Sequence, residues 1–198
     1  MATRPLNRPN AHMLNHIELV YAPGERALAR CLFEGLGFRV VDPQTDPIPD
    51  NLGPAAAPYL VIYMDPDDGD VIDNVLYASE ANPDQWRFER ALSESLASDE
   101  KLAALHRKLL EAYARRPQYM THFGVAYASA EEIEEAMARL ENTPELEGRV
   151  TLSNVYKPGE PGSVDDRVVQ GFVYTDVVSV GLLCAGQQIE MQVRLDGV

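Results

Sequence analysis

The sequence predicts a chain of the α+β class, made of two βαβββ units with a helical insertion between them. Two segments lead to this prediction, because NHIELVYA at 15–22 and THFGVAYA at 121–128 are both strand patterns that contain a His. His16 and His122 are offset by 106 positions, and the same offset relates Tyr21 to Tyr127. Each segment precedes one helical pattern and then several further strands. We therefore interpret the two halves as an internal duplication.

The first unit is predicted to span residues 14–81, after a flexible tail at 1–13. Its opening strand has one strongly apolar face, because three large residues alternate with His16, Glu18 and Val20: Ile17, Leu19 and Tyr21. Pro23 and Gly24 end that strand, and a helical pattern runs from there to the glycines at 35 and 37. The segments FRVV, PYLVIYM and VIDNVLYASE then predict strands, with a Pro-rich loop at 42–58 after the first of them.

Residues 82–118 carry no strand pattern. Apolar residues recur there at helical spacing and predict two helices: Trp86, Leu92 and Leu96, then Leu102, Leu105 and Leu109. We interpret this segment as an insertion or linker between the halves. Its apolar stripes could serve as packing surface, as a lid or as a contact in a homodimer, and the sequence leaves these three roles open.

The second unit is predicted to span residues 119–198. Ser129 and Glu132 have the spacing of a capping box, so a helix is expected to begin there. Strands are predicted from four segments: VTLSNVY, VVQGFVYTDV, SVGLLCAG and QQIEMQVRL. The last of these alternates strictly, which places Glu190 on the face opposite to Ile189 and Met191.

The composition restricts the function. Apolar residues make up 45% of the chain, which is typical of a globular protein, and the formal net charge is −14. That charge argues against nucleic acid and against an anionic membrane surface as partners, because both need clustered Lys and Arg. No apolar run reaches the roughly eighteen residues that a membrane span needs. With only two cysteines the chain has no disulfide framework, so a cytoplasmic location is expected.

Four motifs give the chain a family resemblance: NHIELVYA, FEGLGFRVVD, THFGVAYA and AGQQIEMQV. In this order they resemble the vicinal oxygen chelate superfamily, which includes glyoxalase I, extradiol dioxygenases and bleomycin resistance proteins. The resemblance implies that the two sheets form one pseudo-symmetric cleft and that a divalent metal is bound in it. Three residues match the metal-binding positions of that family: His16 and His122 on the first strands, and Glu190 on a last strand.

The fourth ligand, a carboxylate of the first half, has two candidates. Glu80 closes VLYASE, whereas Asp73 follows Gly69 by four residues, as Glu190 follows Gly186. The two candidates are seven positions apart, so in one regular strand they face opposite sides and only one can face the cleft. We favour Glu80, because Glu is the usual residue in the family.

Imidazole and carboxylate ligands suit Zn, Ni, Co, Mn or Fe, and the sequence does not choose among them. The resemblance implies a glyoxalase-like lyase or isomerase, which would act on a small substrate that chelates the metal through two vicinal oxygens. Glu80 or Glu190 would then be the catalytic base. A non-haem Fe(II) dioxygenase using His16, His122 and Glu190 is the alternative enzyme.

A third possibility is a metal-free drug-binding protein of the bleomycin-resistance type. The two His residues would then be structural, and Glu190 could lie on a solvent-facing edge strand. Glu80 has a structural alternative too, as a cap for the helix that begins near Asn82.

Overall fold

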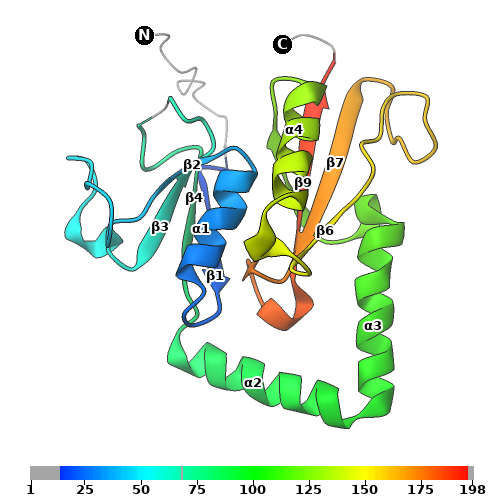
Figure 1. The fold of residues 1–198 in the computed structure, drawn as a ribbon, viewed down its shortest axis with the longest axis horizontal. Helices are drawn as coiled ribbons and strands as arrows, with labels where there is room; N and C mark the ends of the chain where they lie inside the picture. The colour runs from blue at the N-terminus through cyan, green and yellow to red at the C-terminus, as the bar shows by residue number, and fades with distance from the viewer. Residues whose placement is uncertain (1–13, 68, 196–198) are drawn as a thin grey trace.

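The computed structural model describes residues 14–67 and 69–195, and these residues form four α-helices and two mixed β-sheets (Figure 1). The predicted α+β class is therefore confirmed. The predicted tail at 1–13 lies outside the described residues. Within the described residues, no helix is both long enough and apolar enough to cross a membrane.

The first half contains β1 (His16–Tyr21), α1 (Arg26–Gly35), β2 (Arg39–Val41), β3 (Tyr59–Tyr63) and β4 (Val75–Glu80), with a short 3-10 helix η1 (Pro54–Ala56). The strand order of its sheet is β2-β3-β4-β1-β8. β1 and β4 run parallel, and the other pairs are antiparallel. The edge strand β8 (Val178–Ser179) belongs to the second half of the chain.

The second half contains β5 (His122–Ala126), α4 (Ala130–Glu141), β6 (Val150–Leu152), β7 (Val168–Thr175) and β9 (Gln187–Arg194), with η3 (Pro144–Leu146) before β6. The sheet order is β5-β9-β7-β6, and β5 runs parallel to β9. In both halves the first strand of the unit therefore pairs in parallel with the last.

The strand predicted for SVGLLCAG is wrong for most of its length. Only Ser179 of this segment belongs to β8, and the short 3-10 helix η4 (Leu183–Ala185) follows. The backbone N–H groups of Leu183 and Cys184 donate to the carboxylate of Glu89 at 2.7 and 3.2 Å. A side chain of the insertion thus occupies the donors that a strand would need.

The insertion forms α2 (Pro83–Ser98) and α3 (Glu100–Arg115), followed by η2 (Pro117–Tyr119). Asn82 caps α2 by accepting two backbone N–H groups, and Asp99 caps α3 in the same way through one. In Figure 1, α2 runs below both halves and α3 rises beside the second sheet. Each helix has 16 residues, yet only Glu89 of α2 and Tyr113 of α3 are buried. The insertion is therefore sparsely packed.

The two halves share one hydrophobic core. It joins residues of α1 and the first sheet, such as Leu19 and Phe33, to residues of α4 and the second sheet, such as Ile133 and Ile189. Two polar contacts cross the same boundary at the end of α1. The hydroxyl of Tyr127 donates to the Leu36 carbonyl at 2.7 Å, and Nε of Arg139 donates to the Gly35 carbonyl at 3.0 Å.

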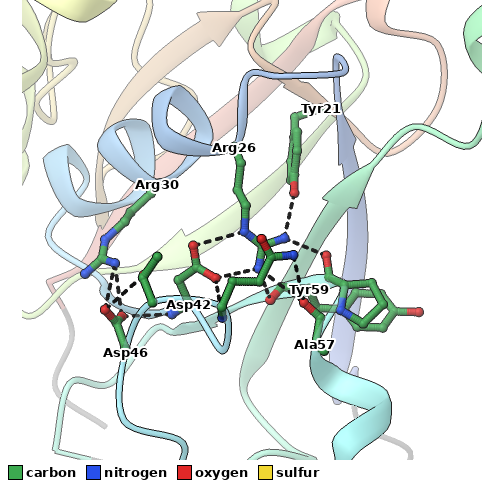
Figure 2. A network of polar contacts seen from close by, with 10 residues as sticks. Tyr21, Arg26, Arg30, Asp42, Asp46, Ala57 and Tyr59 are labelled. Carbon is green, nitrogen blue, oxygen red and sulfur yellow. Dashed lines mark hydrogen bonds and ion pairs between the residues drawn. The ribbon is translucent and has the colours of Figure 1, made fainter.

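A polar network ties the Pro-rich loop to α1 (Figure 2). The Arg26 guanidinium donates to both carboxylate oxygens of Asp42, at 3.0 and 2.6 Å. It also donates to the Tyr21 hydroxyl and to the carbonyls of Pro58 and Tyr59. All five N–H groups of Arg26 thus have acceptors, so the network holds the loop in place and leaves no donor for a ligand.

Candidate metal site on the second sheet

The structure brings His122 and Glu190 together on the second sheet. β5 and β9 are neighbours, and their parallel register places Gly124 opposite Glu190. The side chains of His122 and Glu190 lie on the face opposite to α4, because the alternate residues Val125, Ile189 and Met191 belong to the core. β9 lies between β5 and β7, and Glu190 is only 8% exposed. Glu190 is therefore not on a solvent-facing edge strand.

Two amide side chains hold the Glu190 carboxylate. Nε2 of Gln170 on β7 and Nε2 of Gln192 on β9 both donate to Oε1 of Glu190, the second at 3.0 Å. Oε2 of Glu190 lies 3.2 Å from Nε2 of His122. Gly124 leaves room for this arrangement, because a Cβ at that position would come within 3.2 Å of the same Oε2.

The contacts of His122 define its protonation pattern. Its Nδ1 lies 2.7 Å from the backbone carbonyl oxygen of Met120, which can only accept a hydrogen bond. Nδ1 must therefore carry a proton. In the neutral imidazole, Nε2 then presents a lone pair to a carboxylate oxygen. Two acceptors that face each other at this distance require a shared proton or a cation between them.

This pair fits a divalent metal. A His that binds a metal through one ring nitrogen usually donates its other N–H to a backbone carbonyl or a carboxylate, as Nδ1 of His122 does. Two ligand atoms that are each roughly 2.1 Å from one ion lie about 3.0 to 3.4 Å apart at octahedral or tetrahedral angles. The 3.2 Å between Nε2 of His122 and Oε2 of Glu190 falls in that range. If a divalent metal is bound here, His122 and Glu190 would be two of its ligands.

His16 occupies the matching place in the first half, on the face of β1 that points away from α1. Its ring packs edge-on against Tyr77, with ring centroids 5.9 Å apart, much as His122 packs against Phe172 at 5.7 Å. The surroundings differ, because His16 is exposed and the neighbouring part of its face carries a second apolar cluster: Val41, Val61, Tyr63 and Val75, with Leu52, Val71 and Tyr77 against it.

Neither candidate for the first-half carboxylate occupies the position that corresponds to Glu190. In the second sheet, Glu190 pairs with Gly124, two residues after His122. In the first sheet, the residue two places after His16 is Glu18, and it pairs with Tyr77. Glu80 pairs with Tyr21, which is five places after His16 and therefore on the opposite face. Asp73 precedes β4 and lies outside the strand.

Glu80 has a local structural contact. Its Oε2 accepts the backbone N–H of Gly24 at 3.0 Å, and it borders a cavity of about 320 Å³ beside Arg26 and Gln44. It does not cap α2, because Asn82 does so itself. Within the described ranges, no group of three or more His, Cys, Asp or Glu side chains is arranged around one point. The four-residue ligand set thus stays a prediction.

Sequence reasoning missed Gln170, Gln192 and the carbonyl of Met120. Gln192 follows Glu190 by two residues on one strand, so its position on the same face was predictable, but a glutamine carries no chemical signal that separates it from a surface residue. Gln170 lies 20 positions away, and only the β7–β9 register brings it beside Glu190. Its Oε1 is also unusual, because it is buried and has no hydrogen-bond partner among residues 14–67 and 69–195.

A comparison with known protein families finds no match to this chain, and neither does a comparison with curated proteins. Among solved structures, the chain is similar to the crystal structure of protein PA1353 from Pseudomonas aeruginosa. The identity is 12% and the TM-score 0.41, over 92% of this chain and 98% of that chain. A likeness this distant identifies neither a family nor an activity.

Proposed function

We propose that this chain is a metal-dependent lyase or isomerase of the glyoxalase-like type, and that His122 and Glu190 are its metal ligands. One observation carries the proposal: Nε2 of His122 and Oε2 of Glu190 face each other at 3.2 Å while Nδ1 of His122 is committed to the Met120 carbonyl. The metal would act as a Lewis acid toward a substrate with two vicinal oxygens. Glu190 is also the proposed acceptor of a proton from that substrate.

The proposal includes an internal duplication within the vicinal oxygen chelate superfamily. It is supported by the matching strand orders and by a His at the same place on the first strand of each half. On this proposal, the two halves now differ in the side chains on their corresponding sheet faces. An apolar cluster occupies part of the face of the first sheet that carries His16, whereas the corresponding face of the second sheet has a polar set around Glu190.

The first experiment measures metal binding by calorimetry and elemental analysis on protein purified without a chelator or His-tag. The wild type is expected to bind one Zn, Ni, Co, Mn or Fe ion per chain. His122→Ala and Glu190→Gln are expected to lose at least about tenfold in affinity, since each removes a ligand atom. Glu80→Gln is the matched control, because Glu80 faces the other side of its sheet, and it should bind as the wild type does.

His16→Ala separates the two enzyme classes. An unchanged metal affinity in His16→Ala supports the lyase or isomerase with ligands from the second half. A loss as large as that of His122→Ala would indicate a set of two His and one carboxylate, which is the arrangement of a non-haem Fe(II) dioxygenase. Oxygen consumption with a catechol would then be the decisive assay.

A metal-free binding protein is the second candidate. It is supported by the direct approach of Nε2 of His122 to Oε2 of Glu190 at 3.2 Å, a distance that a hydrogen bond alone can span. A proton shared by these two residues would then take the place of the metal. Wild-type protein that binds none of the five metals after incubation with each of them would overturn the enzyme proposal and leave this one.

A further inference from the structure

A cavity of about 910 Å³ lies between the helical insertion and the two halves, away from the metal-site residues. It is lined by residues of α2 and α3, of β6, β7 and η4, and of the segment before α1. None of His122, Glu190, Gln170 and Gln192 lines it. Its volume is within the range of roughly 300 to 1,000 Å³ that is typical of small-molecule sites, which often lie between structural units.

Aromatic side chains form part of the cavity wall. Tyr113 of α3 packs against Tyr174 of β7 with ring centroids 4.8 Å apart, and Trp86 of α2 lines the same cavity. Leucines from the insertion add apolar surface, among them Leu96 and Leu110. The faces of aromatic rings carry a negative potential and attract cations, while the leucines suit an apolar body.

A buried carboxylate lies in the wall beside these rings. Glu89 is 2% exposed, and it accepts hydrogen bonds from the backbone N–H groups of Leu183 and Cys184 and from Nε2 of Gln85. Burial and the neighbouring Glu89 raise the pKa of the Cys184 thiol to about 11, so the thiol adds no negative charge. Among the ion pairs of the described residues, none involves Glu89. Dipoles therefore solvate this carboxylate, but no basic side chain neutralises it.

Other residues of the wall are also acidic. Arg149 pairs with Glu25 at 3.0 Å and with Asp176 at 2.6 Å, so two carboxylates share one guanidinium. Glu111 lines the cavity as well, and its own partner is Arg115 on the same helix. Together with Glu89, the wall therefore carries more negative than positive charge.

We propose that this cavity is a second binding site, and that its ligand is an organic cation with an apolar body, such as a hydrophobic amine or quaternary ammonium compound. The aromatic rings and the excess of carboxylates would both contact the cationic group, which is the recognition mode of aromatic cages. The apolar body would pack against the leucines of α2 and α3. This site is separate from the proposed metal site and does not depend on it.

The chain provides its own reporter, because Trp86 is the single tryptophan. The experiment titrates the full chain with benzyltrimethylammonium, and in parallel with its neutral carbon isostere neopentylbenzene, while Trp86 fluorescence is recorded. A chelator is present throughout, so that metal binding at His122 and Glu190 contributes nothing. The cation is expected to give a saturable change and to bind at least about tenfold more tightly than the isostere.

Two variants test the charge. Glu89→Gln and Asp176→Asn should each weaken binding of the cation by about tenfold and leave binding of the isostere unchanged. Asp176→Asn keeps an oxygen that accepts from Arg149, so it remains informative if Glu89→Gln fails to fold. Asp84→Asn is the matched control, because its exposed side chain on α2 pairs with Arg87 outside the cavity, and it should bind as the wild type does.

Three results would overturn the proposal. One is equal affinity for the cation and the neutral isostere. Another is a Trp86 signal that neither compound changes. The third is Trp86 emission that changes with protein concentration alone, which would indicate that a second copy of the chain fills the cavity. None of them bears on the metal titration, so the two proposals fail independently.

Discussion

Among the residues that the structure describes, Gln170 uses one amide atom in a hydrogen bond and leaves the other without a partner. Its Nε2 donates to Glu190, while its Oε1 is buried without a partner. A buried acceptor without a donor costs about 1 to 3 kcal/mol. The opposite orientation of the amide would place Oε1 against the Glu190 carboxylate, which is worse. The cost of this unpaired acceptor is consistent with a role in which Nε2 of Gln170 holds Glu190 in position beside His122.

Gln170→Met tests this positioning role. The variant loses the hydrogen bond to Glu190 and the unpaired Oε1 together, so the free energy of unfolding should change by no more than about 1 kcal/mol. The metal affinity should fall by about tenfold, because Glu190 is less firmly oriented. Urea unfolding and calorimetric metal titration measure the two quantities. Gln192→Met, which removes the other donor, is the comparison, and unchanged metal affinity in both variants would contradict the positioning role.

Individual residues also show where sequence reasoning stops. The alternation of QQIEMQVRL placed Glu190 correctly with respect to Ile189 and Met191, because period two is a property of any strand. The partner position in the first half depends on the register between β1 and β4, and neither strand contains a residue that specifies it. That register puts Tyr77 at the place for which Glu80 and Asp73 were the candidates.

At the level of elements, the loop at 42–58 depends on one arginine. The side chains of Arg26 and Asp42 are 18% and 8% exposed, and the Tyr21 hydroxyl and the carbonyls of Pro58 and Tyr59 accept the remaining N–H groups of Arg26. The Arg26 guanidinium lowers the pKa of the Asp42 carboxyl below its usual value. The contact between Arg26 and Asp42 could not be predicted from the Pro-rich sequence, because the two residues are 16 positions apart and belong to different elements.

Arg26→Met should destabilise the chain by about 2 to 4 kcal/mol near neutral pH, since it leaves Asp42 buried without its cation. A lowered folded-state pKa stabilises the fold above the unfolded pKa of about 3.9, and this contribution is lost as the pH falls through the lowered value. The difference in the free energy of unfolding between the variant and the wild type should therefore become smaller at acidic pH. Urea unfolding at about pH 7 and about pH 2 checks both parts.

Arg30→Met is the matched control for this network. Arg30 pairs with Asp46 and Glu34, whose side chains are 26% and 49% exposed, so it should contribute no more than about 1 kcal/mol. An equal loss of stability in the Arg26 and Arg30 variants would show that the burial of Asp42 does not matter.

At the level of the whole molecule, α1 and α4 make the two halves one unit. A Cβ on Gly35 of α1 would lie 2.7 Å from Cδ2 of Leu140 on α4, and Leu140 is 1% exposed. The two helices approach closely because a glycine stands at that point. The sequence suggested only that Gly35 ends a helix, since a contact between helices 100 residues apart has no local signature.

Gly35→Ala should therefore lower the free energy of unfolding by about 1 to 3 kcal/mol through overpacking. In a Leu140→Ala background the clash is absent, and the same change should be neutral or slightly stabilising, because alanine favours a helix by up to about 1 kcal/mol over glycine. Circular dichroism during urea unfolding of the four proteins measures this coupling. If the effects of Gly35→Ala and Leu140→Ala on the free energy of unfolding are additive in the double variant, the loss of stability does not come from the contact with Leu140.

Because β8 comes from the second half of the chain, the first sheet can be completed only late in translation. β1 is made early, yet the strand that pairs with the end of its outer edge, at Val20 and Tyr21, is Val178–Ser179, near the end of the described chain. While a ribosome is still translating the second half, the first sheet therefore presents an unpaired edge next to apolar residues. Such edges invite pairing with other nascent chains. A truncation before residue 178 should thus aggregate more readily than the full chain, because it lacks both this edge strand and β9, which lies inside the second sheet.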